Sequence, residues 1–385
     1  MVRRNMLAAA TAVSVGLMSF AASADTVKIG IIAPLSGPLS GSWGVPFQQG
    51  IDTWVAMHGT EIGGNEVELI YRDLPGVDPQ KALSLAQELI INEDVQYLGG
   101  FVTTPNALAV ANIVQQAKVP TVIFNAAGPT IVGKSDYFTR TSNTLPQITV
   151  PLAKYVAENG LKRIVTAVAD YSPGHDAEKA FEEAYGAEGE IIEKIRIPMS
   201  TTDFGPFVQK IRLLEPDALF VFLPVGPATY GFVKAYNENG LKEDGIRFFG
   251  LAETQESDLQ QLGDGAIGME TSYMYSAAHD SDTNREFLAK FAEVNPGATV
   301  NPATVMAFDG MHVLYEMIAA TDGKRDPEAA MAAVKGFAWE SPRGPVHIDA
   351  DTRQIIQNIS IRRVERADDG LLINKEIQTY ENVAP

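Results

Sequence analysis

Short apolar runs alternate with stretches of helical periodicity along the first half of the chain. Runs typical of buried strands occupy 27–33, 67–71, 95–98 and 121–124. Apolar positions with a period near 3.6 cover 47–57, 79–91 and 106–117. Because single helices separate the strands, this pattern predicts parallel βαβ units with right-handed crossovers.

The same pattern resumes after a short break at 142–146 and predicts a second α/β unit of similar size. Its strands are expected at 163–169, 190–197, 218–223 and 247–251, and its helices at 146–158, 176–185, 204–214 and 229–239. Helices at 285–294, 304–319 and 327–334 and β-like segments at 346–349, 358–364 and 376–380 follow. These late elements are too few to form a domain alone, so we expect them to return and complete both units.

Residues 1–24 have the three parts of a secretory signal peptide. Arg3 and Arg4 supply the positive start, an apolar run follows at 6–20, and small residues precede a cleavage site before Asp25. A membrane anchor is the alternative, but the run is shorter than the ~20 residues that span a bilayer, and hydroxyl side chains interrupt it. We therefore predict export, with a mature chain in the periplasm.

The acidic balance of the chain narrows the class of partner. Lys and Arg number 30 and Asp and Glu 48, which gives −18, and loss of Arg3 and Arg4 with the signal leaves −20. Such acidity disfavours contact with a phosphate backbone, so no nucleic acid is expected as a partner. It suits a soluble monomer. The sequence has no cysteine, which excludes a disulfide framework, thiolate chemistry and a lipid-modified cysteine.

No motif in the sequence supports catalysis or cofactor binding. Gly128 to Ser135 match the P-loop pattern, but a P-loop must run into a helix whose first amides hold phosphate. Here an aromatic and β-branched stretch follows at 136–141, which indicates extended chain and a surface loop. The five histidines are scattered, so no metal site is predicted, and the serines of 34–44 do not form a nucleophile elbow. We expect no catalytic residue and no cofactor, and predict that the chain is not an enzyme.

Three strand-to-helix turns remain as candidates, since ligands of open α/β sheets bind at the carboxyl ends of the strands. The turn at 34–44 carries Trp43, which is either a wall of the ligand site or a packed anchor. The turn at 99–105 carries Thr103 and Thr104.

Thr104 before Pro105 is expected to be an N-cap with proline at the first helical position. It is either a cap alone or, with free helix amides beside the Thr hydroxyls, a binding site for a carboxylate. The third turn, at 125–128, has little side-chain bulk and allows close approach of a ligand.

Over essentially the whole mature region the chain resembles the type I periplasmic solute-binding proteins of ABC importers, in the leucine/isoleucine/valine-binding branch. The matching segments are VKIG (27–30), PLSGP (34–38), GG (99–100) through TT (103–104), NAA (125–127), YFTRTS (137–142) and DYSPG (170–174). The resemblance implies an α/β fold of two Rossmann-like parallel-sheet lobes joined by three hinge crossings. It implies a lobe I of 25–144 plus 277–350 and a lobe II of 145–276 plus 351–385, with the ligand between them.

The resemblance also implies roles for residues of lobe I. Thr104 falls where the family holds the ligand carboxylate through a hydroxyl and a backbone amide, with Thr103 beside it. Ala126, between Asn125 and Ala127, falls at a backbone carbonyl that receives an amino group.

Three further positions match the pocket that holds the ligand side chain. Trp43 matches an aromatic residue of this pocket after a one-residue shift. Tyr171 matches a tyrosine that the second lobe contributes to the cleft, and Val225 falls where an aromatic residue is often found.

Two departures from the family pattern bear on the ligand. Gly128 stands where amino-acid binders place a Thr hydroxyl, and the acid that pairs with an α-ammonium falls at or beside Ala252, next to Glu253. An ammonium without its partner would lose a charged hydrogen bond of about 1.5–3 kcal/mol. Three segments resemble a sub-branch in which some members bind aromatic carboxylates such as benzoate derivatives: 171–177, 275–280 and 339–345. We expect an aromatic or other non-amino carboxylate, with a branched-chain amino acid as the alternative.

The expected function is that of a periplasmic receptor that captures a small carboxylate and delivers it to the permease subunits of an ABC importer. A ligand sensor of the same fold, which regulates a partner protein without transport, is the alternative from another class.

Overall fold

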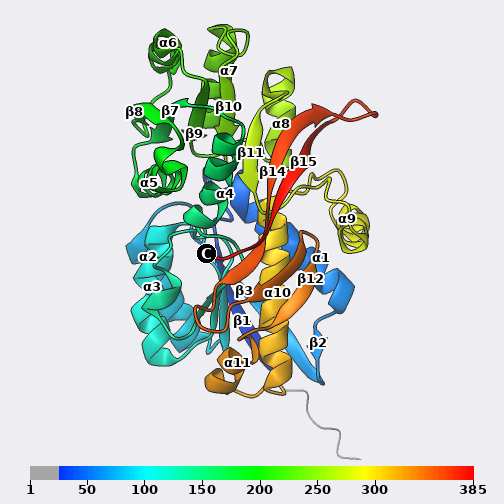
Figure 1. The fold of residues 1–385 in the computed structure, drawn as a ribbon. Helices are drawn as coiled ribbons and strands as arrows, with labels where there is room; N and C mark the ends of the chain where they lie inside the picture. The colour runs from blue at the N-terminus through cyan, green and yellow to red at the C-terminus, as the bar shows by residue number, and fades with distance from the viewer. Residues whose placement is uncertain (1–25) are drawn as a thin grey trace, which may run out of the picture.

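The computed structural model describes residues 26–385, so the predicted signal peptide lies outside the described residues. Two α/β lobes stand one above the other in Figure 1, and the end of the chain lies between them. Among residues 26–385, none of the helices combines the length and the apolar character that a bilayer crossing requires.

The lower lobe is built on a six-stranded sheet in the order β2-β3-β1-β4-β5-β6. Its strands are β1 (Thr26–Ala33), β2 (Glu61–Ile62), β3 (Asn65–Asp73), β4 (Tyr97–Gly100), β5 (Thr121–Ile123) and β6 (Phe138–Arg140). Every pair is parallel except β2 with β3. The predicted parallel βαβ arrangement of this unit is confirmed.

Helices from both ends of the chain cover the lower sheet. They are α1 (Val45–His58), α2 (Pro79–Gln87), α3 (Thr104–Ala117), α9 (Asp282–Val294), α10 (Pro302–Ala320) and α11 (Pro327–Ala333). The apolar helix α10 is buried on nearly all sides and packs against α1. The late helices therefore return to the first unit, as the sequence predicts.

The upper lobe is built on part of a nine-stranded sheet in the order β12-β13-β14-β11-β10-β9-β7-β8, with β15 beside β14. Strands β12 and β13 and the first half of β14 continue this sheet into the lower lobe (Figure 1). Its strands are β7 (Arg163–Ala169), β8 (Glu190–Ile197), β9 (Ala218–Phe222), β10 (Arg247–Gly250), β11 (Glu270–Tyr273), β12 (Ala338–Ser341), β13 (Gly344–Ile348), β14 (Ile355–Arg366) and β15 (Leu372–Val383). Its helices are α4 (Leu145–Glu158), α5 (Ser172–Tyr185), α6 (Gly205–Leu214), α7 (Pro227–Glu238) and α8 (Glu256–Leu262). Strands β7 to β11 pair in parallel, and β14 runs antiparallel to β11.

The described chain passes between the lobes after β6, after β11 and along β14. The first half of β14 pairs with β13 through 355–357, and its second half pairs with β11 through 360–363. In Figure 1 this long strand rises from the lower lobe into the upper one. The division into 25–144 plus 277–350 and 145–276 plus 351–385 stays a prediction.

Four short elements were not expected from the sequence: β2, β11, α8 and β12. Strand β11 is the most instructive, because Glu270-Thr271-Ser272-Tyr273 has no apolar run although every residue is buried. Glu270 is neutralised by Arg247 at 2.5 Å and Arg363 at 2.6 Å, which come from neighbouring strands. Only the assembled sheet provides these partners. The local sequence has no apolar run, and it therefore does not indicate a strand here.

Two of the three passages meet at one buried guanidinium. Arg343, in the turn between β12 and β13, donates to the Thr141 carbonyl after β6 and to Met274 Sδ after β11, both at 2.5 Å. Its charge pairs with Asp309 of α10 at 2.8 Å, and neither side chain is exposed to solvent. The Arg343–Asp309 pair thus joins the first two passages to the lower lobe.

A half-buried His–Glu pair also lies at the second passage and predicts a dependence of stability on pH. Nδ1 of His279 lies 2.9 Å from Glu376 Oε2 on β15, and this hydrogen bond raises the pKa of His279 above its usual 6.5. A raised pKa means that the pair stabilises the fold fully below about pH 6.5, and that this contribution is lost as the pH rises through the folded-state pKa. Between pH 6 and 8.5 we expect a loss of about 0.5–1 kcal/mol in the free energy of unfolding, measured with urea.

The matched comparison is Glu376→Gln, in which this loss should shrink. Burial raises the pKa of Glu253 to about 7, which lowers stability in the same direction as the pH rises. The difference between the two proteins isolates the His279 pair. Identical pH slopes in both would show that the pair contributes nothing.

Candidate functional site

The predicted site residues lie on two sheet edges that face each other. Those of the lower lobe follow β1, β4 and β5, and those of the upper lobe follow β7, β9 and β10. The chain leaves β6 and β11 for the other lobe at their carboxyl ends, and both strands are parallel to their neighbours in these groups. The carboxyl edge of each parallel group is therefore turned toward the opposite lobe, where ligands of open α/β sheets bind.

Trp43 lies at the carboxyl edge of the lower sheet, in a single π-helical turn, Ser40–Gly44, that leads into α1. Its side chain is half-buried and packs against the lower core while keeping part of its surface free. A Cβ atom on the next residue, Gly44, would lie 1.8 Å from the Pro34 carbonyl oxygen. Only glycine permits this approach, which places the indole at the end of β1.

The N-terminus of α3 supplies hydrogen-bond donors and a free hydroxyl. Thr103 is the N-cap residue in extended geometry, so the prediction that Thr104 caps the helix is wrong by one residue. Thr104 already has helical geometry, and its hydroxyl accepts the N–H of Gly128 at 3.1 Å instead. The Thr103 hydroxyl is buried without a partner among the described residues. The amides of Thr104 and Asn106 have no acceptor within the helix.

The turn at 125–128 is held from two sides. The Asn125 side chain donates to the Val102 carbonyl at 2.7 Å, and the N–H of Ala126 donates to the Phe101 carbonyl at 3.0 Å. On the other side, the Ala127 carbonyl accepts the N–H of Leu145, the first residue of α4, at 3.2 Å. This turn therefore joins the α3 terminus to the first passage between the lobes.

Gly128 has a steric reason to lack a side chain. A Cβ atom there would lie 2.5 Å from Thr104 Cγ2 and 2.9 Å from Thr104 Oγ1. The placement of Thr104 thus excludes the second Thr hydroxyl that the resemblance leads one to expect at this turn.

The upper edge contributes Tyr171 and Val225. Tyr171 precedes α5, and its ring stacks on Phe222 with centroids 6.4 Å apart and planes inclined by 21°. Burial, with the nearby charge of Glu253, raises the pKa of its hydroxyl, which therefore stays protonated. Val225 is half-buried in the turn between β9 and α7. The upper edge thus offers an aromatic pair and, in a neighbouring turn, an apolar side chain.

Glu253 is buried, and the upper lobe already uses both of its carboxylate oxygens. Oε1 accepts the N–H of Leu223 at 2.9 Å, and Oε2 accepts the N–H of Leu251 at 2.5 Å. Burial raises its pKa to about 7 against the opposing effect of these bonds and of Arg362. Its neighbour Ala252 is half-buried and has no charge to offer.

The P-loop match is a loop, as predicted. After Gly128 the chain forms a turn and a short 3₁₀ segment, Val132–Lys134, and enters β6. No helix begins there, so no row of free amides is available for phosphate. Within residues 26–385, no cluster of three or more His, Asp or Glu side chains could hold a metal ion.

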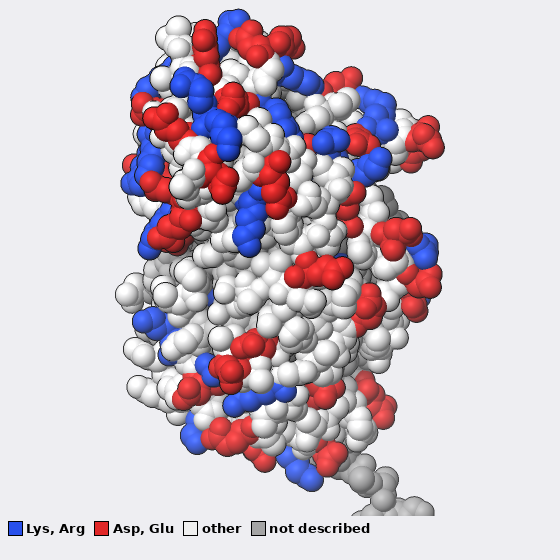
Figure 2. All heavy atoms as spheres, in the orientation of Figure 1, with Lys and Arg blue, Asp and Glu red and all other residues white. Residues whose placement is uncertain are grey.

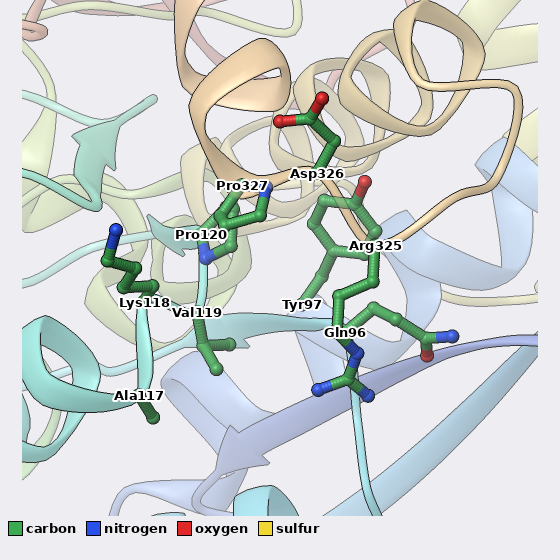
Figure 3. A pocket seen from close by; sticks show the side chains of 9 residues that line it. All are labelled: Gln96, Tyr97, Ala117, Lys118, Val119, Pro120, Arg325, Asp326 and Pro327. Carbon is green, nitrogen blue, oxygen red and sulfur yellow. The ribbon is translucent and has the colours of Figure 1, made fainter.

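A hollow of about 210 Å³ lies at the opposite edge of the lower sheet, before β4 and β5. Figure 3 shows that Lys118 and Arg325, which line it, point to different sides and do not converge. Each already has a carboxylate, Glu328 at 2.7 Å and Asp94 at 2.8 Å. These cations do not form an anion site, and the hollow is separate from the predicted ligand residues.

On the face that Figure 2 shows, charged side chains lie mainly over the upper lobe and the lower end, with few in the belt between them.

Two residues near the site were missed by sequence reasoning. Phe222 stacks on the ring of Tyr171. Because it is the last residue of an apolar strand, the sequence pattern indicates only a core residue there. Arg140 on β6 is fully buried and donates to the Gly128 carbonyl at 2.7 Å. The sequence signal that could have indicated Arg140 is a charged residue at the end of a short, otherwise buried strand.

Comparison with known proteins gives consistent matches. A family model described as periplasmic binding protein matches residues 26–370. The Leu/Ile/Val-binding protein homolog 6 of Brucella abortus (strain 2308) is 49% identical over 378 residues, 97% of this chain and 96% of that protein.

Two solved structures have the same fold and cover nearly the whole chain. The solute-binding protein of an ABC transporter from Rhodopseudomonas palustris HaA2, in complex with p-hydroxybenzoic acid, is 46% identical with a TM-score of 0.89. A second solute-binding protein from R. palustris, in complex with 4-hydroxybenzoate, is 48% identical with a TM-score of 0.89. Each comparison covers 94% of this chain and 98% of the other.

Proposed function

The chain belongs to the periplasmic binding protein family, and from this premise we propose that it captures a benzoate-type carboxylate between its lobes. The lobes close about the three passages, and the closed form delivers the solute to the permease subunits of an ABC importer. The proposal includes a periplasmic location, a monomeric protein and release of the solute without chemical change.

The observation that carries the choice of ligand is the state of Glu253. An amino acid brings a positive ammonium group that must be paired when it is buried. Both oxygens of Glu253 are bonded to the amides of Leu223 and Leu251. Ala252, at or beside which the resemblance places the acid, has no charge. A ligand without an ammonium group leaves nothing unpaired here, so this arrangement supports an acid that is not an amino acid.

A carboxylate finds donors at the lower edge. The Thr103 hydroxyl has no other partner among the described residues, and the first amides of α3 are free within the helix. The positive end of the helix dipole adds to these hydrogen bonds. We infer that the carboxylate binds here, beside Thr104 and the turn at 125–128.

An aromatic ring suits the rest of the space. Trp43 comes from the lower edge and Tyr171, supported by Phe222, from the upper edge. Offset or edge-to-face contacts contribute about 0.5–1.5 kcal/mol per aromatic pair beyond burial. The two R. palustris relatives that bind 4-hydroxybenzoate support this reading.

A branched-chain amino acid is the second candidate, favoured by the name of the B. abortus relative. It would require Glu253 to exchange its bonds to two main-chain amides for one to the ammonium group, leaving Leu223 and Leu251 with unpaired donors. That cost supports the aromatic acid.

The test is a titration calorimetry series on protein refolded to remove carried ligand. We expect 4-hydroxybenzoate and benzoate to bind and to raise the melting temperature, and leucine and valine to do neither. X-ray scattering should show a smaller radius of gyration with the bound acid, and mass spectrometry should recover it unchanged. Binding of leucine or valine, with every benzoate inactive, would overturn the choice of ligand.

A further inference from the structure

Three arginines of the described chain are fully or almost fully buried, and one of them lacks a carboxylate partner. Arg343 pairs with Asp309 at 2.8 Å, and Arg362 lies 3.9 Å from Glu256. Among residues 26–385, no Asp or Glu oxygen lies within ion-pair distance of Arg140, which is 0% exposed. A buried charge without a counter-ion is unfavourable, so its retention needs a reason.

The contacts of Arg140 are all with neutral main-chain groups. One terminal nitrogen donates to the Gly128 carbonyl at 2.7 Å and the other to the Asn143 carbonyl at 3.1 Å. Its Nε is buried without a partner. Burial lowers the pKa of Arg140 to about 9, and no acidic side chain opposes this effect. The guanidinium is therefore hydrogen-bonded but not neutralised.

The position of this charge is directly behind the proposed carboxylate anchor. Gly128, whose carbonyl receives Arg140, gives its N–H to the hydroxyl of Thr104. Asn143, the other acceptor, belongs to the first passage between the lobes. A single residue thus separates the buried cation from the edge where a ligand carboxylate would bind.

We propose that Arg140 makes the site selective for an anion, because the ligand carboxylate is the counter-ion that the protein itself does not provide. Arg140 is a positioning residue, since it acts through the Gly128 turn and through its electric field without touching the ligand. This inference rests on the proposed function and adds the source of its charge selectivity.

The expected size follows from Coulomb's law. If the ligand carboxylate lies about 8 Å from the guanidinium, an effective dielectric constant of about 20 gives a change of roughly thirtyfold in the binding constant. The quantity to measure is the ratio of the Kd for neutral 4-hydroxybenzamide to the Kd for 4-hydroxybenzoate. This ratio cancels contacts with the ring, and comparison with Arg140→Lys, which keeps the charge, separates loss of charge from displacement of the Gly128 turn.

The decisive variant is Arg140→Gln, which removes the charge and keeps an N–H donor for the Gly128 carbonyl. We expect the ratio to fall about tenfold or more in Arg140→Gln and to change by less than about threefold in Arg140→Lys, which keeps the charge. The matched control is Arg353→Gln. Arg353 also donates to main-chain carbonyls, including that of Phe138 at 3.1 Å, but it is only half-buried, so water screens its charge more than that of Arg140.

The outcomes separate this inference from the proposed function. If wild-type protein binds the benzoate and the ratio is unchanged in Arg140→Gln, the inference is wrong and the proposed function stands. If wild-type protein binds no carboxylate of the series, both fail.

A measurement on wild-type protein covers the case in which Arg140→Gln does not fold. The Nε–H resonance of Arg140, identified by its absence from the Arg140→Lys spectrum, should shift when 4-hydroxybenzoate is added. It should shift less with the benzamide. Equal shifts with both ligands would contradict the proposed counter-ion.

Discussion

Arg343→Met is expected to lower the free energy of unfolding by about 3–5 kcal/mol, the largest effect that we predict for a single substitution. The change leaves the Asp309 carboxylate buried and without its cation, although Trp339 and Ser341 still donate to it at 2.9 and 2.8 Å. It also removes the donors to the passages at Thr141 and Met274. Urea denaturation at neutral pH measures the loss.

The double variant Asp309→Asn with Arg343→Met is the control for this explanation. It removes the uncompensated charge while keeping volume and some hydrogen bonding, so part of the lost stability should return. A loss below about 1 kcal/mol in Arg343→Met, or no recovery in the double variant, would show that the ion pair does not hold the passages together.

Gly128→Thr is expected to weaken binding of 4-hydroxybenzoate by roughly five- to 150-fold. The new Cβ atom would meet Thr104 Cγ2 at 2.5 Å, so either Thr104 or the turn must move. Overpacking of this kind costs about 1–3 kcal/mol, which corresponds to that range when the displaced groups are those that bind the ligand. Titration calorimetry measures the change.

Gly133→Ala is the matched control, because no atom lies within 4 Å of its added Cβ and it belongs to the same loop. Its affinity should equal that of wild type. Wild-type binding by Gly128→Thr would separate this turn from the site.

Most helices and strands of the fold could be predicted from the local pattern of apolar residues. Strands such as β1 and β7 and helices such as α4 appear within one or two residues of their predicted bounds, because each buries a continuous run or a stripe of apolar residues. Strand β11 was not predicted, because its residues are polar, and its buried Glu270 is paired with Arg247 and Arg363 from other strands. Elements stabilised by distant partners leave no periodic signal.

The placement of the candidate turns at the strand ends could be predicted, whereas their role in binding stays a prediction. Parallel strands and the position of the passages bring the segments of Trp43, Thr103, the turn at 125–128 and Tyr171 to facing edges, as expected of strand-end turns. The N-cap was placed one residue too late, because Thr103 and Thr104 have the same capping chemistry. Backbone geometry alone distinguishes them.

The sequence by itself determined that this is an acidic, cysteine-free chain of two α/β units with small, hydroxyl-rich turns at their strand ends, since these features depend on composition and local periodicity. Tertiary structure decided which charges are balanced: Glu253 is bonded to two amides, Arg343 is paired with Asp309, and Arg140 has no acidic partner among the described residues. The reason is physical. A charge is neutralised by what folding places within a few ångströms of it. Leu223 beside Glu253 and Asp309 beside Arg343 come from other elements of the fold, and Arg140 has no acidic neighbour within residues 26–385.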